Sequence, residues 1–451
     1  MPNALKQFKE LGLLKKSQAI VKAQFGRLGI NKKQELSRLL FEIAKREGAL
    51  PQTIIRNAGS SGFHRLKHYL LKRRFPHAYF NKEPAKPYLP KIELGTGSIF
   101  GLAKNELYPE RIFVEKKAAR SRLAENFRKN FPNAQLSEIK SLKDYLGKNK
   151  NFTIKDYNNR RRTFFITHEG HDFFKKCPCT KRAVGCGYHI FNLSFGCIFE
   201  CTYCYLQEYT NTPGIIFPAN IGRFFDIFNS YKMRRMRIGT GEFSDSLMLD
   251  HVTEYSLEIV EFFKRYQEVT FEFKTKSANI GNLLRINHAG NIVAAWSLNP
   301  QRIIEENEFL APPLYERIKA ARLCTEAGYK AAFHFDPVIY FEGWEKEYKN
   351  VIDLLFSTIN PKHVAWVSIG TLRFNPAVKQ VIERRFPANK ILDEELVPGF
   401  DGKLRYPHFI RQDIYKSMLN MLSKHSRKLP VYLCMENPSA WKASGLTPKI
   451  L

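Results

Sequence analysis

The chain has 451 residues, of which 44% are apolar, and a formal net charge of +29. This length accommodates two or three domains with a large core, and the apolar content excludes a disordered chain. No apolar run reaches the roughly 18 residues of a membrane-spanning helix, and the first residues lack the apolar core of a secretory signal, so we expect a cytoplasmic protein with no membrane partner and with reduced thiols.

The positive charge is concentrated in the first third of the chain. Residues 1–165 hold 36 Lys and Arg against 13 Asp and Glu, whereas the remaining residues hold 36 against 30. A basic segment joined to a nearly balanced body indicates a polyanionic partner, and nucleic acid is the first candidate. A solvated basic surface without such a partner is the alternative.

Three zones follow one another along the chain. Residues 1–75 show helical periodicity, as in "QELSRLLFEIAKREG", and predict a basic helical region. Residues 76–165 mix prolines with basic helix-like segments and predict a mixed connecting region. In residues 166–451 strand-like and helix-like runs alternate, which predicts an α/β fold with a parallel sheet and its chemistry at the carboxyl ends of the strands. About six such units predict a partial barrel, not a closed eight-fold one.

Three cysteines lie within eight residues of the stretch "NLSFGCIFECTYCYLQEY", at Cys197, Cys201 and Cys204. In a reducing compartment, clustered cysteines indicate metal binding or catalysis. A structural zinc site normally takes four ligands, often as two Cys-x2-Cys halves, and a spacing of three then two suits this poorly. Three thiolates on one tight loop can instead ligate three irons of a four-iron cluster and leave the fourth iron open to a small molecule.

This spacing, with Tyr203 before the last cysteine, resembles the signature of radical S-adenosylmethionine (SAM) enzymes. The blocks "GCIFECTYCYLQ", "FSDSLMLDH", "FKTKSANIGNLL" and "HFDPVIYFEGWEKEY" are similar, in this order, to the spore photoproduct lyase family over about residues 165–400. The resemblance implies a partial (β/α)6 barrel, a 4Fe-4S cluster on Cys197, Cys201 and Cys204, and reductive cleavage of SAM to a 5′-deoxyadenosyl radical. It does not extend to the basic residues 1–165.

The same resemblance implies SAM-binding roles for residues at the strand ends. Gly241 and Glu242, in "GTGE", match a segment near the amino group of SAM, with a plain strand-end turn as the alternative. Lys276 and Ser297 match positions that hold the SAM carboxylate, a task that suits an ammonium and a hydroxyl. Tyr205 offers its backbone to SAM. Glu242 and Tyr205 are the candidate catalytic residues.

Other polar residues near these strand ends have two interpretations each. Lys274 lies two residues before the preferred SAM ligand, points the same way along the strand, and is set aside only by the family's "TK" pair. Tyr203 is expected to pack against the cluster loop. Asp245 either shapes the SAM pocket or caps the helix that follows. His334 and Asp336 either face the site or form a hydrogen-bonded core pair.

One departure from the family concerns the hydrogen atom that the repair lyases return to their substrate. They have a cysteine just ahead of the "SD" pair for this purpose, and here that position is Glu242. A carboxylate does not replace it, because its O–H bond is too strong and it is ionised at neutral pH. Cys434 is an alternative donor, whereas Cys324 is expected to pack on a helix as a small apolar group.

A second cysteine triplet precedes the first, at Cys177, Cys179 and Cys186. It can ligate an auxiliary cluster or zinc, with His189 or His171 as the fourth ligand. The alternative is three reduced thiols with a structural role.

Three functions are therefore compatible with the sequence. The first is a radical SAM enzyme that repairs or modifies a nucleic-acid base, DNA in particular, with a ferredoxin or flavodoxin as its reductant. The second is the same chemistry on RNA or a protein. The third is a non-enzymatic, metal-containing nucleic-acid-binding protein.

Overall fold

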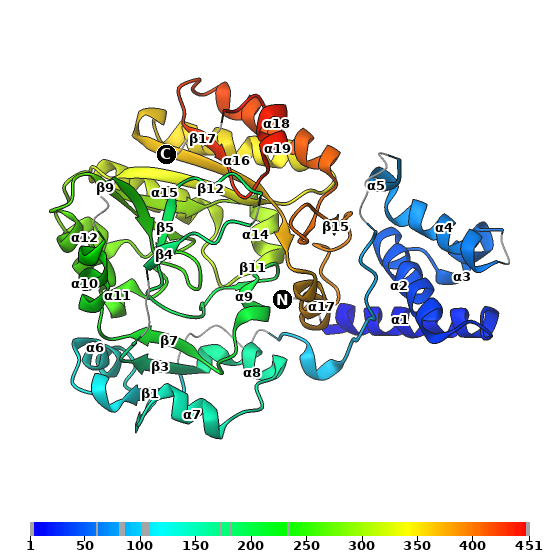
Figure 1. Ribbon diagram of the computed structural model, residues 1–451, viewed down its shortest axis with the longest axis horizontal. Helices are drawn as coiled ribbons and strands as arrows, with labels where there is room; N and C mark the ends of the chain where they lie inside the picture. The colour runs from blue at the N-terminus through cyan, green and yellow to red at the C-terminus, as the bar shows by residue number, and fades with distance from the viewer. Residues whose placement is uncertain are drawn as a thin grey trace.

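The computed structural model describes residues 4–59, 62–80, 86–101, 109–170, 174–180, 182–231 and 235–447. They form a large curved sheet with helices outside it, a small sheet beside its open end, and a group of helices at one side (Figure 1). No helix within these ranges has both the length and the apolar character needed to cross a membrane.

The large sheet forms the partial barrel, and in the described residues it has eight strands. From one edge to the other they are β17 (Val431–Leu433), β13 (Val364–Thr371), β12 (Lys330–Val338), β10 (Ile292–Ser297), β9 (Val269–Thr275), β8 (Met236–Gly239), β5 (Tyr188–Phe191) and β4 (Phe174–Lys176). Neighbours from β17 to β5 pair in parallel, and β4 adds an antiparallel edge. Runs such as "IVAAWS" in β10 are buried along their whole length, as both-faced burial of a parallel strand requires.

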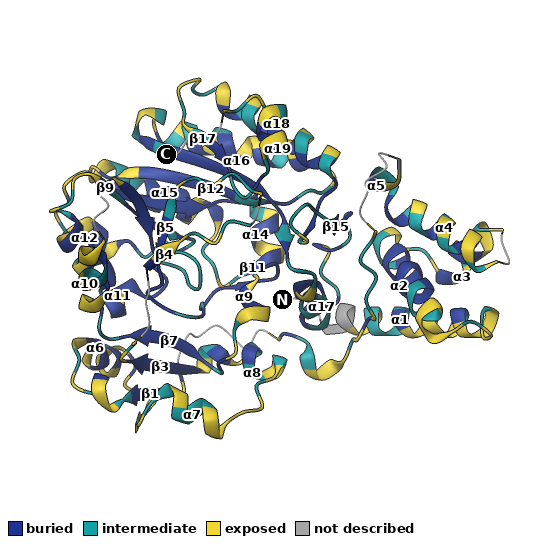
Figure 2. Cartoon of the chain, in the orientation of Figure 1, coloured by how far each residue is buried: buried dark blue, intermediate teal, exposed yellow. Residues whose placement is uncertain are grey.

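Helices cover the outer face of this sheet. They are α10 (Gly222–Ser230), α11 (Asp250–Thr253), α12 (Tyr255–Phe263), α13 (Gly281–Arg285), α14 (Gln301–Asn307), α15 (Leu314–Glu326), α16 (Trp344–Thr358), α18 (His408–Ser423) and α19 (Pro438–Ala443). Figure 2 shows the strands dark blue and the outward faces of the helices yellow, so the core lies between these two layers. A small antiparallel sheet of β14 (Arg373–Phe374), β16 (Leu404–Arg405) and β15 (Val397–Pro398) lies between β13 and β17 in the chain.

A second parallel sheet lies at the open side of the barrel. Its order is β2 (Gln135–Ile139), β1 (Arg111–Glu115), β3 (Thr163–Thr167) and β7 (Ile215–Pro218), and it packs with α6 (Arg122–Asn130), α7 (Leu142–Lys148) and α8 (Ile154–Asn158). The rings of Phe127, Phe164 and Phe217 meet between them, with centroids 5.0 to 5.9 Å apart. The sheet therefore draws strands from both sides of residue 165.

The N-terminal helices form a unit with its own core. They are α1 (Ala4–Gln24), α2 (Ile30–Glu47), α3 (Pro51–Asn57), α4 (Phe63–Arg74) and α5 (Pro76–Phe80). Leu36, Leu39, Leu40 and Ile43 on α2 are completely buried in it. The i, i+3, i+4, i+7 spacing of these residues is the pattern of an amphipathic helix, so the predicted helical periodicity is present here.

A buried network of charges attaches this unit to α17 (Pro376–Arg385). Glu42 forms ion pairs with Arg38 at 2.8 Å, Arg74 at 2.7 Å and Lys379 at 2.7 Å. Arg38 also pairs with Glu383 at 2.8 Å. Burial by itself would raise the pKa of Glu42, but the three cations hold it well below its usual range. Removing one partner would leave buried charges uncompensated, so the network fixes how the helices dock.

Candidate active site

The three clustered cysteines lie on the loop that follows β5. Within it, β6 (Glu200–Cys201) pairs antiparallel with β11 (Glu308–Phe309), which places Cys201 opposite Glu308. The Cys204 N–H donates to the Cys201 carbonyl at 3.0 Å, and α9 (Leu206–Tyr209) follows. Gly196 starts the loop with a φ of +95°, a conformation that favours glycine, and this turn directs the chain into Cys197.

Two arginines from distant segments anchor this loop through Glu200, which is 1% exposed. Arg160 Nη1 and Arg385 Nη2 each lie 2.7 Å from a different Glu200 oxygen. Arg160 also donates to the Phe199 carbonyl at 3.1 Å, and Arg385 to Gln207 Oε1 at 2.9 Å. Burial would raise the pKa of Glu200, and the two guanidinium groups lower it. The loop is therefore fixed on both sides of Cys201.

The donor set of the loop fits an iron–sulfur cluster. Cys197, Cys201 and Cys204 are free thiols within eight residues of one loop. Burial raises the pKa of all three, that of Cys201 to about 12, so binding a metal must displace their protons. Nowhere in the described ranges do three or more His, Cys, Asp or Glu side chains already have ligating geometry, so these thiols would rotate to converge on a metal.

Lys276 extends from the end of β9 to the cysteine loop. Its Nζ lies 3.4 Å from Cys201 Sγ, 3.1 Å from the Tyr203 hydroxyl and 3.5 Å from Glu308 Oε1. The Tyr203 hydroxyl donates to Glu308, and Arg317 Nη2 lies 2.7 Å from the other Glu308 oxygen. Burial would raise the pKa of Glu308, but Lys276 and Arg317 lower it to about 2. The ammonium is thus held beside the thiols by a fully buried carboxylate.

Sequence reasoning did not identify this carboxylate or its neighbours. Asn299, at the end of β10, donates to Glu308 Oε1 at 2.8 Å and accepts from the Tyr348 hydroxyl at 2.6 Å. No local pattern marks Glu308 or Asn299, because their partners come from other strands and helices. Glu200 did carry a signal, since an acid inside the apolar run "CIFEC" is buried only when it is paired.

The two lysines of β9 have different surroundings. Lys276 reaches the cysteine loop, whereas the charge of Lys274 acts on His334 and Asp336 inside the barrel. Gly241 lies over the Lys274 stem, where a Cβ would sit 3.8 Å from it. The structure therefore brings only Lys276 of this pair beside the thiols.

The other predicted SAM-binding residues surround the same strand ends. The Tyr205 hydroxyl donates to the backbone carbonyl of Glu242, and the Glu242 carboxylate lies 2.7 Å from Lys175 Nζ. Ser297 is buried at the end of β10, and its carbonyl accepts from Arg317 at 3.0 Å. Glu242 and Tyr205 therefore contact each other, whereas Ser297 belongs to the Glu308 side of the site.

Asp245 links the loop after β8 to the end of β9. Its Oδ1 accepts from the Thr275 hydroxyl at 2.6 Å and the Leu247 N–H at 3.0 Å, and its Oδ2 accepts from the Lys276 N–H at 2.6 Å. This geometry supports a role beyond the two interpretations given above. Asp245 positions the backbone that carries Lys276.

Inside the barrel, a chain of buried polar groups runs across four strands. Arg237 on β8 lies 3.0 Å from Glu272 on β9, whose other oxygen lies 2.6 Å from His334 Nε2. His334 Nδ1 lies 2.6 Å from the Ser368 hydroxyl on β13. Burial would raise the pKa of Glu272, but Arg237 and His334 lower it well below its usual range.

The expected hydrogen-bonded pair of His334 and Asp336 was wrong. They are two residues apart on β12, and Asp336 lies nearer the mouth, where it pairs with Arg373 at 2.7 Å. Arg373 also donates to Cys434 Sγ at 3.4 Å. Each residue of the expected pair thus has partners on neighbouring strands, because cross-strand groups at one level are closer than successive inward positions.

The second triplet lies in the hairpin loop between β4 and β5. Cys177, Cys179 and Cys186 are half-buried free thiols. His189, one of the expected fourth ligands, stacks on the Phe174 ring and directs its Nδ1 to a backbone carbonyl at 3.0 Å. The other, His171, lies outside the described residues.

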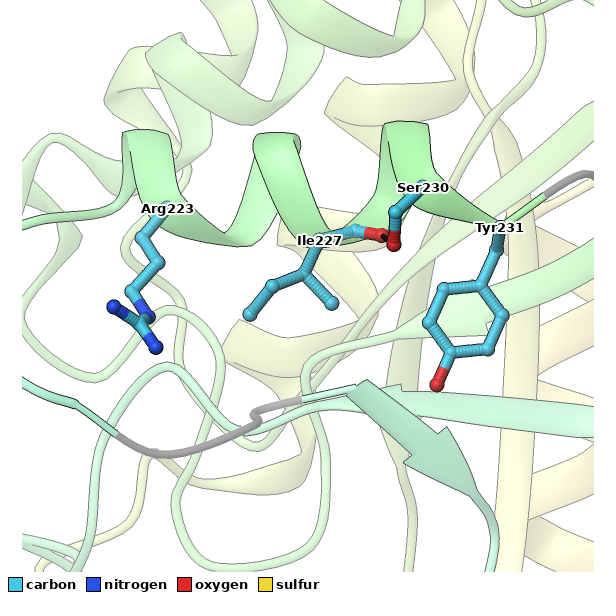
Figure 3. Close-up of a pocket in the computed structure, with 4 residues that line it drawn as sticks. All are labelled: Arg223, Ile227, Ser230 and Tyr231. Atoms are coloured by element: carbon cyan, nitrogen blue, oxygen red, sulfur yellow. Dashed lines mark hydrogen bonds between the residues drawn. The ribbon is translucent and has the colours of Figure 1, made fainter.

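A pocket on the outer surface is separate from these groups. It runs along α10 and is lined by Arg223, Ile227, Ser230 and Tyr231 (Figure 3). None of the strand-end residues above lines it, so we do not assign it to the candidate site.

Comparison with known proteins agrees with this arrangement. The profile of the spore photoproduct lyase family matches residues 107–427. The chain belongs to the spore photoproduct lyase family. The spore photoproduct lyase of Bacillus subtilis is 27% identical over 306 residues, which cover 65% of this chain and 86% of the relative. That of Clostridium acetobutylicum is 26% identical over 247 residues, covering 52% and 73%.

Solved structures with similar folds come from the same family. A spore photoproduct lyase complexed with dinucleoside spore photoproduct has a TM-score of 0.60 and 22% identity, and covers 73% of this chain and 100% of its own. A mutant with bound AdoMet and dinucleoside spore photoproduct gives the same TM-score, identity and coverage. At this identity the likeness shows the fold, and it confirms the predicted partial barrel.

Family membership confirms the expected enzyme class and cofactors. The protein is a radical SAM enzyme whose cofactors are a 4Fe-4S cluster and SAM. The non-enzymatic alternative is therefore set aside. The roles of individual residues toward the cluster and SAM stay predictions. The helices α1–α5 lie outside the matched residues.

Proposed function

We propose that the protein acts on DNA and opens the bond between two bases joined by ultraviolet damage. The observation that carries this proposal is the loop of Cys197, Cys201 and Cys204, with the Lys276 ammonium 3.4 Å from one thiol, in a chain of the spore photoproduct lyase family. Relatives of that name cover most of the chain, and three solved ones hold dinucleoside spore photoproduct.

Different residues of the chain would bind the cluster and SAM. Cys197, Cys201 and Cys204 would hold the cluster, and Lys276 would pair with the SAM carboxylate. When bound, the cluster would supply an electron, and SAM would supply the radical chemistry that removes a hydrogen atom from the damaged base. Asp245 keeps Lys276 in place through its backbone, and Glu308 keeps the ammonium charged and directed at the loop.

Ser297, Gly241, Glu242 and Tyr205 complete the proposed SAM site. Ser297 lies on the Glu308 side, where its hydroxyl can add a hydrogen bond to the carboxylate of SAM. Glu242 and Gly241 lie on the opposite side, where a carboxylate suits an ammonium group. The hydroxyl of Tyr205 fixes the Glu242 backbone and so shapes that side.

Glu242 also supports a second candidate, base modification without return of the hydrogen atom. Its carboxylate lies 2.7 Å from Lys175, at the position where the family has its donor cysteine. An ion-paired carboxylate does not donate a hydrogen atom to a carbon radical. Repair by this chain therefore needs a hydrogen-atom donor other than the residue at position 242.

The basic N-terminal helices are the proposed grip on the DNA backbone. Residues 1–80 hold 17 Lys and Arg against 4 Asp and Glu, and Lys15, Lys16 and Lys22 on α1 are exposed. Such side chains release counterions from phosphates and add affinity without sequence preference. The target base must leave the stack to reach the barrel mouth. A ferredoxin or flavodoxin is the proposed source of the electron.

Anaerobic SAM cleavage tests the proposed reaction. The reconstituted protein is mixed with SAM and dithionite, with irradiated DNA, unirradiated DNA or irradiated RNA. We expect 5′-deoxyadenosine in all mixtures and loss of base dimers only with irradiated DNA, and Cys201→Ala should produce neither. Cleavage of SAM without any change in irradiated DNA would overturn the proposed substrate. No cleavage with the cluster intact would overturn the chemistry.

A further inference from the structure

The hairpin that carries the second cysteine triplet is hydrogen-bonded to the segment that follows β17, at the other edge of the barrel sheet. Cys177 follows the edge strand β4, and its N–H donates to the Tyr188 carbonyl at 2.9 Å. On the far side of the hairpin, the Val184 N–H donates to the Glu436 carbonyl at 2.8 Å. Glu436 lies two residues after Cys434, which follows β17 at the opposite edge. One loop therefore bridges the first and last strands.

This bridge gathers four cysteines from the two edges. Cys179 lies beside Cys177, whose carbonyl accepts from the Cys179 N–H at 2.7 Å, and Cys186 lies two residues before Tyr188, the backbone partner of Cys177. Cys434 lies two residues before Glu436, and the backbone partner of Glu436 is Val184, which lies two residues before Cys186. All four are free thiols. They form one group, composed of three hairpin thiols and one from β17.

Cations surround this group. Arg373 Nη2 donates to Cys434 Sγ at 3.4 Å, and its Nε lies 3.4 Å from the sulfur of Met435. Lys403 is a second cation at this border, and its Nζ lies 3.8 Å from the same Met435 sulfur. Four thiolates on a divalent metal carry a net charge of about −2, which this cationic border would offset.

We propose that Cys177, Cys179, Cys186 and Cys434 bind a second metal centre, zinc or an iron–sulfur cluster, that fastens the two edges of the barrel sheet together. Four thiolates complete a closed tetrahedral zinc site or all the protein ligands of a cluster. The site is therefore structural, unlike the three-cysteine loop, which leaves a position open. Cys434 is the fourth ligand, in place of the histidine expected from the sequence. Its thiol comes from the other edge of the sheet, so the metal would link the two edges.

The four side chains would have to rotate about χ1 to bind. Like the loop of Cys197, they lack ready ligating geometry in the part of the chain that is described. Each coordinated thiol gives up its proton to solvent when the metal enters. The proposal does not depend on SAM chemistry, and it predicts metal that stays when the first cluster is removed.

Metal content of anaerobically purified full-length protein tests this site. In Cys197→Ala/Cys201→Ala/Cys204→Ala we expect about one zinc or about four irons to remain per chain. Adding Cys186→Ala or Cys434→Ala should reduce this below a tenth, whereas adding Cys324→Ala, a buried thiol on α15, should leave it unchanged. Zinc would give thiolate-to-metal absorption after cobalt exchange, and a cluster would give iron–sulfide absorption.

A second arm uses the chain with its first cluster in place. Cys186→Ser/Cys434→Ser should lose the second metal but keep the reduced-cluster resonance of the first, and its melting temperature should no longer rise by several degrees on metal loading. Metal that persists in this variant, or a triple variant that binds neither zinc nor iron after reconstitution while its circular dichroism is native, would overturn the proposal. A disulfide among the four cysteines in anaerobic protein would do the same.

Discussion

The ammonium of Lys276 lies 3.4 Å from the sulfur of Cys201, whereas the stem of Lys274 lies against Gly241. We predict that Lys276→Ala weakens SAM binding at least tenfold, about 1.4 kcal/mol, because the SAM carboxylate loses its cation. Lys274→Ala is the matched control, and it should bind SAM within about threefold of the wild type. Equilibrium binding to cluster-loaded protein measures both. Equal losses in the two variants would contradict the assignment.

We predict that Glu200 is needed to hold the cysteine loop in place and takes no part in the reaction itself. Glu200→Gln leaves two buried guanidinium groups without a counter-charge, which costs about 3 kcal/mol. We expect a fall in melting temperature and in iron bound per chain. Glu326→Gln, which removes an exposed pair with Arg322, should cost less than about 0.5 kcal/mol. Full iron content in Glu200→Gln would show that the anchors do not hold the loop.

Acid should weaken the fold through Glu308. Its pKa is lowered from 4.5 to about 2, so its contribution is complete above pH 4.5 and is lost as the pH falls toward 2. Between pH 5 and 3.5 this amounts to about 1 kcal/mol. We predict that Glu308→Gln, although less stable at pH 5, loses about that much less than the wild type over this interval. Urea unfolding at the two pH values measures it, and parallel losses would refute the prediction.

The residue at position 242 should decide how much of the opened lesion becomes normal bases. We predict that Glu242→Cys yields several-fold more repaired base per 5′-deoxyadenosine than the wild type, because a thiol can return a hydrogen atom. In D2O the repaired base should carry deuterium, since thiol protons exchange with solvent. Glu242→Gln separates this effect from loss of the Lys175 pair. The same yield in both variants would rule out a donor at this position.

DNA binding should depend on the N-terminal helices. We predict that Lys15→Glu/Lys16→Glu/Lys22→Glu weakens binding about tenfold and lowers the slope of log affinity against log salt by about 0.9 per lost contact. Lys319→Glu/Lys346→Glu/Lys416→Glu makes the same charge change on the exposed helices of the barrel and should have little effect. If both triple variants bind equally, the grip lies elsewhere.

The barrel and the cysteine loop were predictable because their signals are local. A buried parallel strand is a continuous apolar run, as in β10, and three closely spaced cysteines describe their own loop. The parallel sheet of β2, β1, β3 and β7 was not predictable, because β3 pairs with β7, which lies some 50 residues later and in a different predicted zone. The same limit applies to the site. Lys274 and Lys276 have one residue between them and the same parity, but β9 ends at Thr275, so Lys276 lies past the strand, where Asp245 holds its backbone.

The ten residues of α17 serve two attachments at once. Lys379 and Glu383 receive the N-terminal helices, while Arg385, at the last turn, receives Glu200 of the cysteine loop. The helix is about 15 Å long, so the unit proposed to bind DNA and the loop proposed to hold iron are attached to the same short helix. A shift of the N-terminal helices on a bent duplex would therefore be transmitted through Arg385 to Glu200 and Gln207, on the two sides of Cys201.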